Sequence, residues 1–373
     1  MLPVRSHLRT YVRDTYLGKS MSLNPRYAPI DCAVGSSQWG ISSLATYAHR
    51  SFDIATTTPY SQAFHQDTFI PNILARFGLV DIFNPEQVFL GHGSFNLGER
   101  IAHKLIEPGK LLGVGPQFVE IPSEFIAAGF TYRPIPLTYS DSEGYKFPMD
   151  RLCEEIDTGT YTALYLDNPN NPLGYHVNNE EIAKIVALAE RKGCIVLLDE
   201  AYGDFLPDTC SSATLCSSFS NLIVIRSLSK AFGIEGLRVG YAFMSSALAQ
   251  YYRQLDVPFE PTIYAAVIGN AVMQDMLFMD SVRNTVIEHK QRIYEAFNKN
   301  DIDVLPTHPA TSIMSITLRH GGDICEKMTG IGIAIENGSF FAASNPQWDD
   351  RFCRFRIPAP NLTDELIARV CTL

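Results

Sequence analysis

The sequence of 373 residues has no apolar run long enough to cross a membrane, which takes about 18 consecutive apolar residues. Its richest segments, residues 194–198 and 263–273, are short or interrupted by polar residues. The first residues, Met-Leu-Pro-Val-Arg-Ser-His, lead into a polar and charged segment, so we expect no export signal. We therefore expect a protein that does not associate with membranes.

Closely spaced cysteines are also lacking. The eight cysteines are scattered along the chain, and none forms a Cys-x-x-Cys pair. Structural zinc sites and disulfide frameworks usually show such spacing in the sequence. We therefore predict no metal site and mostly free thiols, as expected for a cytoplasmic protein.

Runs of basic residues are absent as well. Thirty Lys and Arg residues against forty Asp and Glu residues leave a net charge of −10. A protein that binds nucleic acid usually carries a basic surface, so we expect no nucleic-acid partner. Internal repeats and Gly/Ser linkers are also missing, so domain boundaries have to come from the order of the secondary-structure elements.

Short apolar runs alternate with amphipathic segments between residues 87 and 243. The runs are typical of buried strands and cover residues 88–90, 111–114, 163–166, 194–198 and 222–225. The clearest helix is predicted over 178–192, where Asn178 or Asn179 can cap the first turn. This order predicts an α/β fold, a mainly parallel sheet sandwiched by helices, with ligands bound at the carboxyl ends of the strands.

The pattern changes after residue 243. A longer helix is predicted over 280–299, followed by short strands near 313–318 and 354–357. We expect a large α/β domain over 41–250, which binds the ligand. A smaller α+β domain would consist of 251–373 together with the N-terminal segment 1–40, which has too little apolar periodicity to fold alone and would pack on this domain or on a partner subunit.

Three segments place unusual polar residues after predicted strands. The first is Asp167-Asn-Pro-Asn-Asn-Pro-Leu-Gly174, a proline-rich loop that aims side-chain amides. The second is Asp199-Glu-Ala-Tyr202, whose leading carboxylate ends an apolar strand and needs a cationic partner. The third begins Arg226-Ser-Leu-Ser-Lys-Ala-Phe-Gly, and its Lys230 and Arg238 suit a reactive amine beside an anionic phosphate.

In this order and spacing the three segments resemble the fold type I aminotransferases that use pyridoxal phosphate. The motif Ser-Leu-Ser-Lys-Ala-Phe-Gly is most similar to that of the histidinol-phosphate aminotransferase branch. The resemblance covers roughly residues 60–356. It implies that Lys230 forms the Schiff base with the cofactor and moves the proton between the substrate Cα and the cofactor C4′ carbon. It also implies that Asp199 pairs with the pyridine nitrogen, and that Asn171 and Tyr202 hydrogen-bond the 3′ oxygen.

The resemblance also implies a phosphate-binding cup. The segment Gly91-His-Gly-Ser-Phe95 precedes a predicted helix, so the backbone amides of Gly93, Ser94 and Phe95 can meet the phosphate at the positive helix end. Ser227 and Arg238 would complete this cup.

Three further residues match family positions. Phe118 falls where an aromatic side chain stacks on the pyridine ring. Tyr60 matches a tyrosine that reaches the phosphate from the neighbouring subunit, which implies a homodimer. Arg356 matches the arginine that binds the substrate α-carboxylate; Arg354 is the competing choice, but we expect it to point to the other face of its strand.

The stretch Ala33-Val-Gly-Ser-Ser-Gln-Trp-Gly40 differs from the Asn-rich, Glu-containing stretch that is usual in histidinol-phosphate members. Gln38 and Trp39 are candidate contacts for a substrate side chain, although a tryptophan in such a loop also suits packing over a core.

The leading hypothesis is an aminotransferase that moves an amino group between an amino acid or amine and a keto acid. The alternative is a lyase or cyclase on the same scaffold, which would eliminate a group, close a ring or decarboxylate the substrate; cofactor-binding motifs do not separate the two. A non-catalytic sensor domain ranks below both, because it would not need Lys230 and because the forty residues ahead of the fold are too few for a DNA-binding domain.

Overall fold

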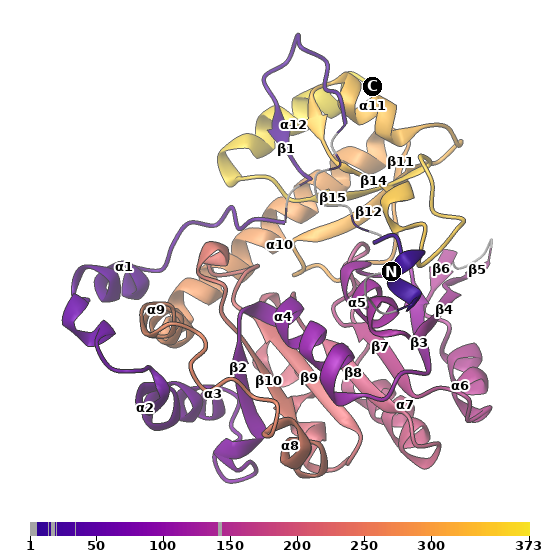
Figure 1. Cartoon of the computed structure of the whole chain (residues 1–373). Helices are drawn as coiled ribbons and strands as arrows, with labels where there is room; N and C mark the ends of the chain where they lie inside the picture. The colour runs from indigo at the N-terminus through magenta and orange to yellow at the C-terminus, as the bar shows by residue number, and fades with distance from the viewer. Residues whose placement is uncertain (1–5, 14, 16–18, 20, 34, 141–143) are drawn as a thin grey trace.

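The computed structural model describes residues 6–13, 15, 19, 21–33, 35–140 and 144–373. Its centre is a seven-stranded sheet (Figure 1). In spatial order the strands are β2 (Val88–Gly91), β10 (Gly240–Met244), β9 (Leu222–Ser227), β8 (Ile195–Asp199), β7 (Ala163–Asp167), β3 (Lys110–Gly115) and β4 (Thr131–Pro136). Only β10 is antiparallel to its neighbours, so the predicted mainly parallel sheet is confirmed.

Both faces of this sheet are buried, which explains the continuous apolar runs. Alternate side chains enter two different core clusters: Leu198 and Val224 belong to one, and Leu197 and Ile223 belong to the other. Helices cover each face (Figure 1). The helices of this part of the chain are α1 (Ser43–Arg50), α2 (Gln62–Phe64), α3 (Ile70–Arg76), α4 (Gly93–Arg100), α5 (Glu120–Ala128), α6 (Met149–Asp157), α7 (Asn179–Arg191), α8 (Ser246–Tyr252) and α9 (Ile263–Gln274). Of these, α1 lies to the side of the sheet, against α9.

The predicted helix over 178–192 is α7. Asn178 is its N-cap, and the side chain accepts a hydrogen bond from the backbone N–H of Glu181. Ile182, Ile185 and Val186 form its buried face, as the spacing of the apolar residues indicates.

A second, four-stranded antiparallel sheet lies above the first in Figure 1. Its strands, in spatial order, are β11 (Ile302–Val304), β12 (Ile313–Leu318), β15 (Phe352–Arg356) and β14 (Glu336–Asn337). The helices α10 (Met276–Lys299), α11 (Ile324–Gly330) and α12 (Thr363–Val370) pack on it. The helix α10 begins four residues before the predicted start because Asp275 caps it, accepting a hydrogen bond from the N–H of Phe278.

The N-terminal segment contacts both sheets. The short strand β1 (Ile30–Asp31) pairs with β13 (Ile333–Ala334) beside the second sheet, as expected for a segment that packs on the smaller domain. Arg13, in contrast, binds Glu120 of α5, on the first sheet. A small hairpin of β5 (Thr138–Ser140) and β6 (Gly144–Lys146) completes the strands; the domain division at residues 41 and 250 stays a prediction.

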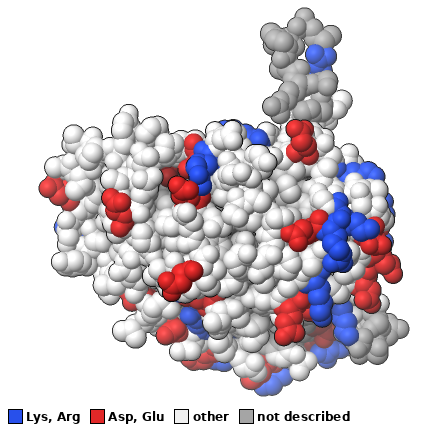
Figure 2. Space-filling model, turned by 90° about the horizontal axis from the view of Figure 1, so that it is seen from below, with Lys and Arg blue, Asp and Glu red and all other residues white. Residues whose placement is uncertain are grey.

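Within the described residues, no helix has the length and apolar character that a membrane span requires. Positive and negative side chains are interspersed on the face drawn in Figure 2, which carries no continuous basic surface. All eight cysteines are free thiols.

Candidate active site

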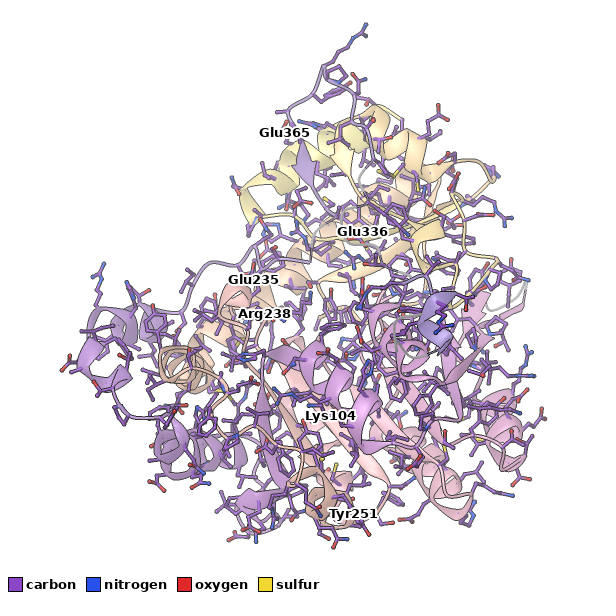
Figure 3. All side chains as sticks on the ribbon, in the orientation of Figure 1. Lys104, Glu235, Arg238, Tyr251, Glu336 and Glu365 are labelled. Carbon is purple, nitrogen blue, oxygen red and sulfur yellow. The ribbon has the colours of Figure 1, made fainter. Side chains whose placement is uncertain are left out.

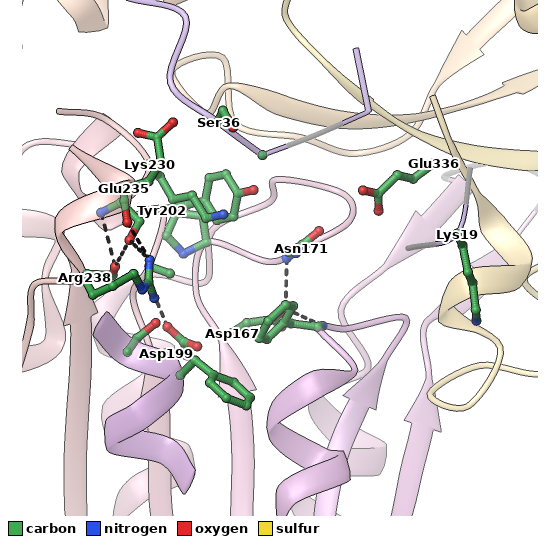
Figure 4. A pocket seen from close by; sticks show the side chains of 18 residues that line it. Lys19, Ser36, Asp167, Asn171, Asp199, Tyr202, Lys230, Glu235, Arg238 and Glu336 are labelled. Carbon is green, nitrogen blue, oxygen red and sulfur yellow. Dashed lines mark hydrogen bonds between the residues drawn. The ribbon is translucent and has the colours of Figure 1, made fainter. Parts of the chain in front are cut away.

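A cavity of about 310 Å³ lies at the carboxyl ends of β7, β8 and β9, below the second sheet (Figure 4). Parallel strands place their ligand sites at this edge. The side chains and backbone that line it come from both sheets and from the N-terminal segment. They are Lys19, Gly35, Ser36, Ser94, Phe95, Phe118, Asp167, Pro169, Asn171, Asp199, Ala201, Tyr202, Ser227, Ser229, Lys230, Glu235, Arg238 and Glu336.

Asp199 is the last residue of β8 and is buried at the floor of the cavity. Its Oδ1 accepts a hydrogen bond from the backbone N–H of Ala201 at 3.0 Å, and its Oδ2 accepts one from the Tyr165 hydroxyl at 3.4 Å. Burial raises the pKa of this carboxyl to about 7. A cation bound in the cavity beside this carboxyl would favour its ionised form.

Lys230 lies in the loop after β9 and brings its amine to the same cavity. Its Nζ is 5.6 Å from the centre of the Tyr202 ring. Gly35 leaves room for this amine, because a Cβ at position 35 would lie 2.8 Å from Nζ. The Tyr202 hydroxyl is buried and has no hydrogen-bond partner among the described residues, so it can serve a bound group.

The residues of the predicted phosphate cup lie around Arg238, in the same cavity as Lys230. Arg238 donates to Ser229 Oγ at 3.1 Å, and Ser229 Oγ accepts in addition from Ser227 Oγ at 2.8 Å. A Cβ at Gly93 would lie 2.6 Å from Arg238 Nη2, and the backbone at Gly93 has a positive φ of 82°. Glycine is therefore required there for two reasons, and Ser94 and Phe95 follow it in the first turn of α4.

Asp167, which ends β7, is a site residue that the sequence analysis missed. Its Oδ2 accepts the backbone N–H groups of Phe118 and Asn171, each at 2.9 Å. This carboxylate thereby holds two predicted cofactor contacts in place, and burial raises its pKa to about 7. The same pattern that marks Asp199, a carboxylate that ends a buried strand, was present in the sequence.

A fully buried ion-pair cluster supports the segment that carries Tyr202. Arg226 on β9 binds Glu200 and, at 3.0 Å, Asp204. Arg76 of α3 binds Asp204 from the other side at 2.8 Å. Removing one member would leave a buried charge without its counter-charge, so the cluster fixes the position of residues 199–205 beside Lys230.

The two arginines of β15 have different surroundings. Arg354 donates to Asn171 Oδ1 at 3.1 Å and binds Glu336 Oε1 at 2.7 Å, and both partners line the cavity. Arg356 donates to the backbone oxygen of Asp31 at 2.6 Å, and Asp31 is not a lining residue. Neither arginine lines the cavity itself, so the difference between them is that Arg354 binds two residues of the cavity wall.

The expectation that Arg354 points to the other face of the strand is wrong, because residues two apart in a strand share a face. Both guanidinium groups lie on the same side of β15, close enough for each to affect the other electrostatically. They differ in the segments that they contact: Arg354 binds Asn171 and Glu336, and Arg356 binds Asp31.

Three other predicted site residues, Gln38, Trp39 and Tyr60, do not line the cavity. Trp39 packs, partly buried, against the core clusters of both sheets, and neither Trp39 nor Gln38 lines the cavity. Their contact with a substrate stays a prediction. Tyr60 is 77% exposed and packs on Phe259, with ring centres 4.6 Å apart.

Comparison with known proteins settles the family. The family described as "Aminotransferase class I and II" matches residues 45–372. The chain belongs to the class I and II aminotransferases. As a member of this family it is a pyridoxal phosphate-dependent aminotransferase, and nothing in the comparisons favours the lyase or cyclase alternative.

Curated relatives point to one branch of the class I and II aminotransferases. The chain is 30% identical to histidinol-phosphate aminotransferase of Caldanaerobacter subterraneus subsp. tengcongensis over 71% of its length and 72% of the relative. It is 31% identical to histidinol-phosphate aminotransferase 2 of Haemophilus influenzae, over 73% and 77% of the two chains.

The crystal structure of histidinol-phosphate aminotransferase from Clostridium acetobutylicum shares the fold with a TM-score of 0.78, at 21% identity, and covers 91% of this chain and 98% of that one. The similarity at this level of identity demonstrates the shared fold of these aminotransferases and nothing more.

The residues of the cavity fit the cofactor of the class I and II aminotransferases. A cup built from an arginine, two serine hydroxyls and a glycine without Cβ suits a phosphate. Lys230 favours the ionised form of the buried Asp199 carboxylate without forming a salt bridge among the described residues, and a protonated pyridine nitrogen would supply a direct partner. The unpartnered hydroxyl of Tyr202 suits the 3′ oxygen.

Proposed function

We propose that this aminotransferase transfers an amino group from an amino acid or amine to a keto acid, with Lys230 as the group that moves the proton. The supporting observation is the position of the Lys230 amine, beside the Tyr202 ring and in the same cavity as Asp199. Pyridoxal phosphate, when bound, supplies an electron sink for the electrons that remain when the Cα–H bond breaks.

The other residues bind and orient. We assign Arg238, Ser227 and the first turn of α4, from Gly93 to Phe95, to the phosphate. Asp199 would hold the pyridine nitrogen protonated, Phe118 would stack on the ring, and Asn171 and Tyr202 would hydrogen-bond its 3′ oxygen. Because Asp167 fixes the backbone at Phe118 and Asn171, we assign it a positioning role.

Transfer of a labelled nitrogen tests this function. Incubation of the holoenzyme with a ¹⁵N-labelled amino acid and an unlabelled keto acid is expected to yield a new amino acid that carries the label. Release of the label as ammonia, or carbon dioxide in place of a keto acid, would contradict the proposal and favour the lyase alternative.

We assign the substrate carboxylate to Arg354 in preference to Arg356, because Arg354 contacts Asn171 at the cavity wall. Replacing Arg354 by glutamine is expected to raise KM for an amino acid donor about 10- to 100-fold, since a charge-assisted bond to the carboxylate is lost. Steady-state kinetics measure this change. In the matched variant Arg356→Gln we expect KM to change less than about threefold; the reverse ranking would restore Arg356 to this role.

We propose a homodimer in which Tyr60 reaches the site of the neighbouring subunit. The segment from α1 to α2 supports this proposal, because it exposes three large side chains, Tyr47, Ile54 and Tyr60, each more than 70% accessible. Large apolar and aromatic side chains exposed within one segment are typical of an interface. Sedimentation velocity tests the assembly, and a monomer at assay concentration would contradict it.

We also propose a cytoplasmic location, for which the eight free thiols argue. The relatives are named for histidinol phosphate. For this chain we propose a small-molecule amino acid or amine, with histidinol phosphate as one compound in the donor panel.

A further inference from the structure

Glu336 is a charged residue of the cavity to which none of the roles above is assigned. It is the first residue of β14, only 7% of its surface is exposed, and it lines the cavity from the second sheet. Figure 3 shows it on the second-sheet side, across from Glu235 and Arg238. In the close view of Figure 4 its carboxylate extends into the cavity toward Asn171.

The two oxygens of this carboxylate differ. Oε1 accepts from Arg354 at 2.7 Å, whereas Oε2 is buried and has no hydrogen-bond partner among the described residues. A buried acceptor without a hydrogen bond lowers the stability of the folded protein, so such an atom usually binds a ligand or a water molecule. Burial raises the pKa of Glu336, while Arg354 and Lys230 favour its ionised form.

The remaining charges of the cavity are already engaged. Asp199 and Arg238 face the cofactor in the proposed function, and Asp167 is occupied by backbone N–H groups. Lys19 lies over the Phe340 ring, 5.1 Å from its centre, and Figure 4 shows its side chain directed away from Glu336. Glu235 Oε2 is likewise buried without a partner among the described residues, but Glu235 lies beside Arg238, on the side assigned to the phosphate. Glu336 is therefore the acidic group on the second-sheet side with an acceptor atom open to a donor from a substrate.

Charge balance at Arg354 and Glu336 constrains the substrate further. The two side chains form a neutral pair, so a substrate carboxylate bound at Arg354 meets the negative charge of Glu336 close by. A substrate that brings a cation along with its carboxylate satisfies both groups. A second negative charge on the substrate would be repelled by the carboxylate of Glu336.

We infer that Glu336 selects donors that carry a cationic nitrogen beyond Cα, such as an ammonium, guanidinium or imidazolium side chain. This inference rests on the proposed amino transfer and names its substrate class. The cation would donate to Oε2 of Glu336 while the α-carboxylate binds Arg354, so a basic amino acid matches both charges. An acidic amino acid places its second carboxylate against the negative charge of Glu336.

The test measures the first half of the reaction, keto acid formed without an acceptor, for ornithine, lysine, arginine, histidine, norleucine and glutamate. Norleucine replaces the side-chain ammonium of ornithine by a methyl group. We expect the best basic donor to exceed norleucine and glutamate in kcat/KM, and Glu336→Gln to reduce its advantage over norleucine about 10- to 100-fold. The rate with norleucine should stay within about threefold in this variant.

A matched variant, Glu235→Gln, removes the other glutamate of the cavity. It lies near Arg238 and far from β14 in sequence, and we expect it to leave the basic preference unchanged. The inference is overturned if the wild type shows no basic preference, if the preference survives Glu336→Gln, or if Glu235→Gln abolishes it equally. Amino transfer from norleucine in each of these cases would leave the proposed function standing, whereas no transfer from any donor would remove that function itself.

Discussion

Replacement of Lys230 by alanine is expected to lower kcat/KM for amino transfer by about 10²- to 10⁴-fold, the range that a positioned proton carrier contributes. The amine lies against Tyr202 in the cavity, and no other described lysine there faces the Asp199 side. The phosphate cup does not include Lys230, so the variant is expected to retain pyridoxal phosphate through Arg238 and Ser227.

Two controls separate catalysis from folding in this variant. Methylamine added to Lys230→Ala should restore part of the rate, because a small amine can occupy the space of the lost side chain and carry the proton. Lys104→Ala, at an exposed position of the same chain, should keep full activity. Activity of Lys230→Ala above about 1% of wild type would contradict the assignment of the proton-carrying role.

The second large effect is expected at Asp199, in opposite directions for activity and stability. Asp199→Asn should lower kcat about 10²- to 10⁴-fold, because an amide cannot hold the pyridine nitrogen protonated. The same change should stabilise the cofactor-free protein at pH 8 by roughly 2–4 kcal/mol, because it removes a buried charge whose pKa burial has raised to about 7.

The sign of the pH dependence follows from that raised pKa. Between pH 8 and pH 5, Asp199 takes up a proton in the folded cofactor-free protein while the unfolded chain stays ionised, so stability rises as the pH falls. Urea unfolding of the cofactor-free protein at pH 8 and pH 5 measures this. Asp199→Asn should show a smaller rise than wild type, with Asp167 supplying the remainder.

Asp167→Asn provides the matched comparison. Asp199 accepts a backbone N–H on one oxygen only, which asparagine can reproduce with its own oxygen. Both oxygens of Asp167 accept N–H groups, so an amide nitrogen there faces a donor whichever way it turns. We expect Asp167→Asn to give no gain in stability at pH 8. An equal gain in both variants would show that charge alone, without these hydrogen bonds, determines the effect.

Much of the site could be predicted from the sequence because its residues lie at the ends of apolar runs. Asp199 ends β8, and Asn171 lies in the loop after β7. Both strands are buried on both faces, and such strands appear in the sequence as continuous apolar runs. The loop with Lys230 and Arg238 is likewise contained within a dozen residues. Local sequence therefore fixes most of the cofactor side of the cavity.

The substrate side depends on contacts between distant segments. Which of Arg354 and Arg356 contacts a residue of the cavity wall depends on the position of β15 relative to Asn171 and to the N-terminal segment. Neither relation is visible in a local motif. Glu336 enters the cavity because it pairs with Arg354 across β14 and β15. Trp39 packs against both core clusters, which is the packing role that the sequence analysis left open beside a substrate contact.

The most direct test of the central claim is a single turnover of the holoenzyme with one donor and no acceptor, stopped with acid. The cofactor and the products are then separated and counted. We expect one keto product for each subunit and recovery of the cofactor as pyridoxamine phosphate. Recovery of pyridoxal phosphate together with ammonia, carbon dioxide or a cyclised product would contradict the central claim.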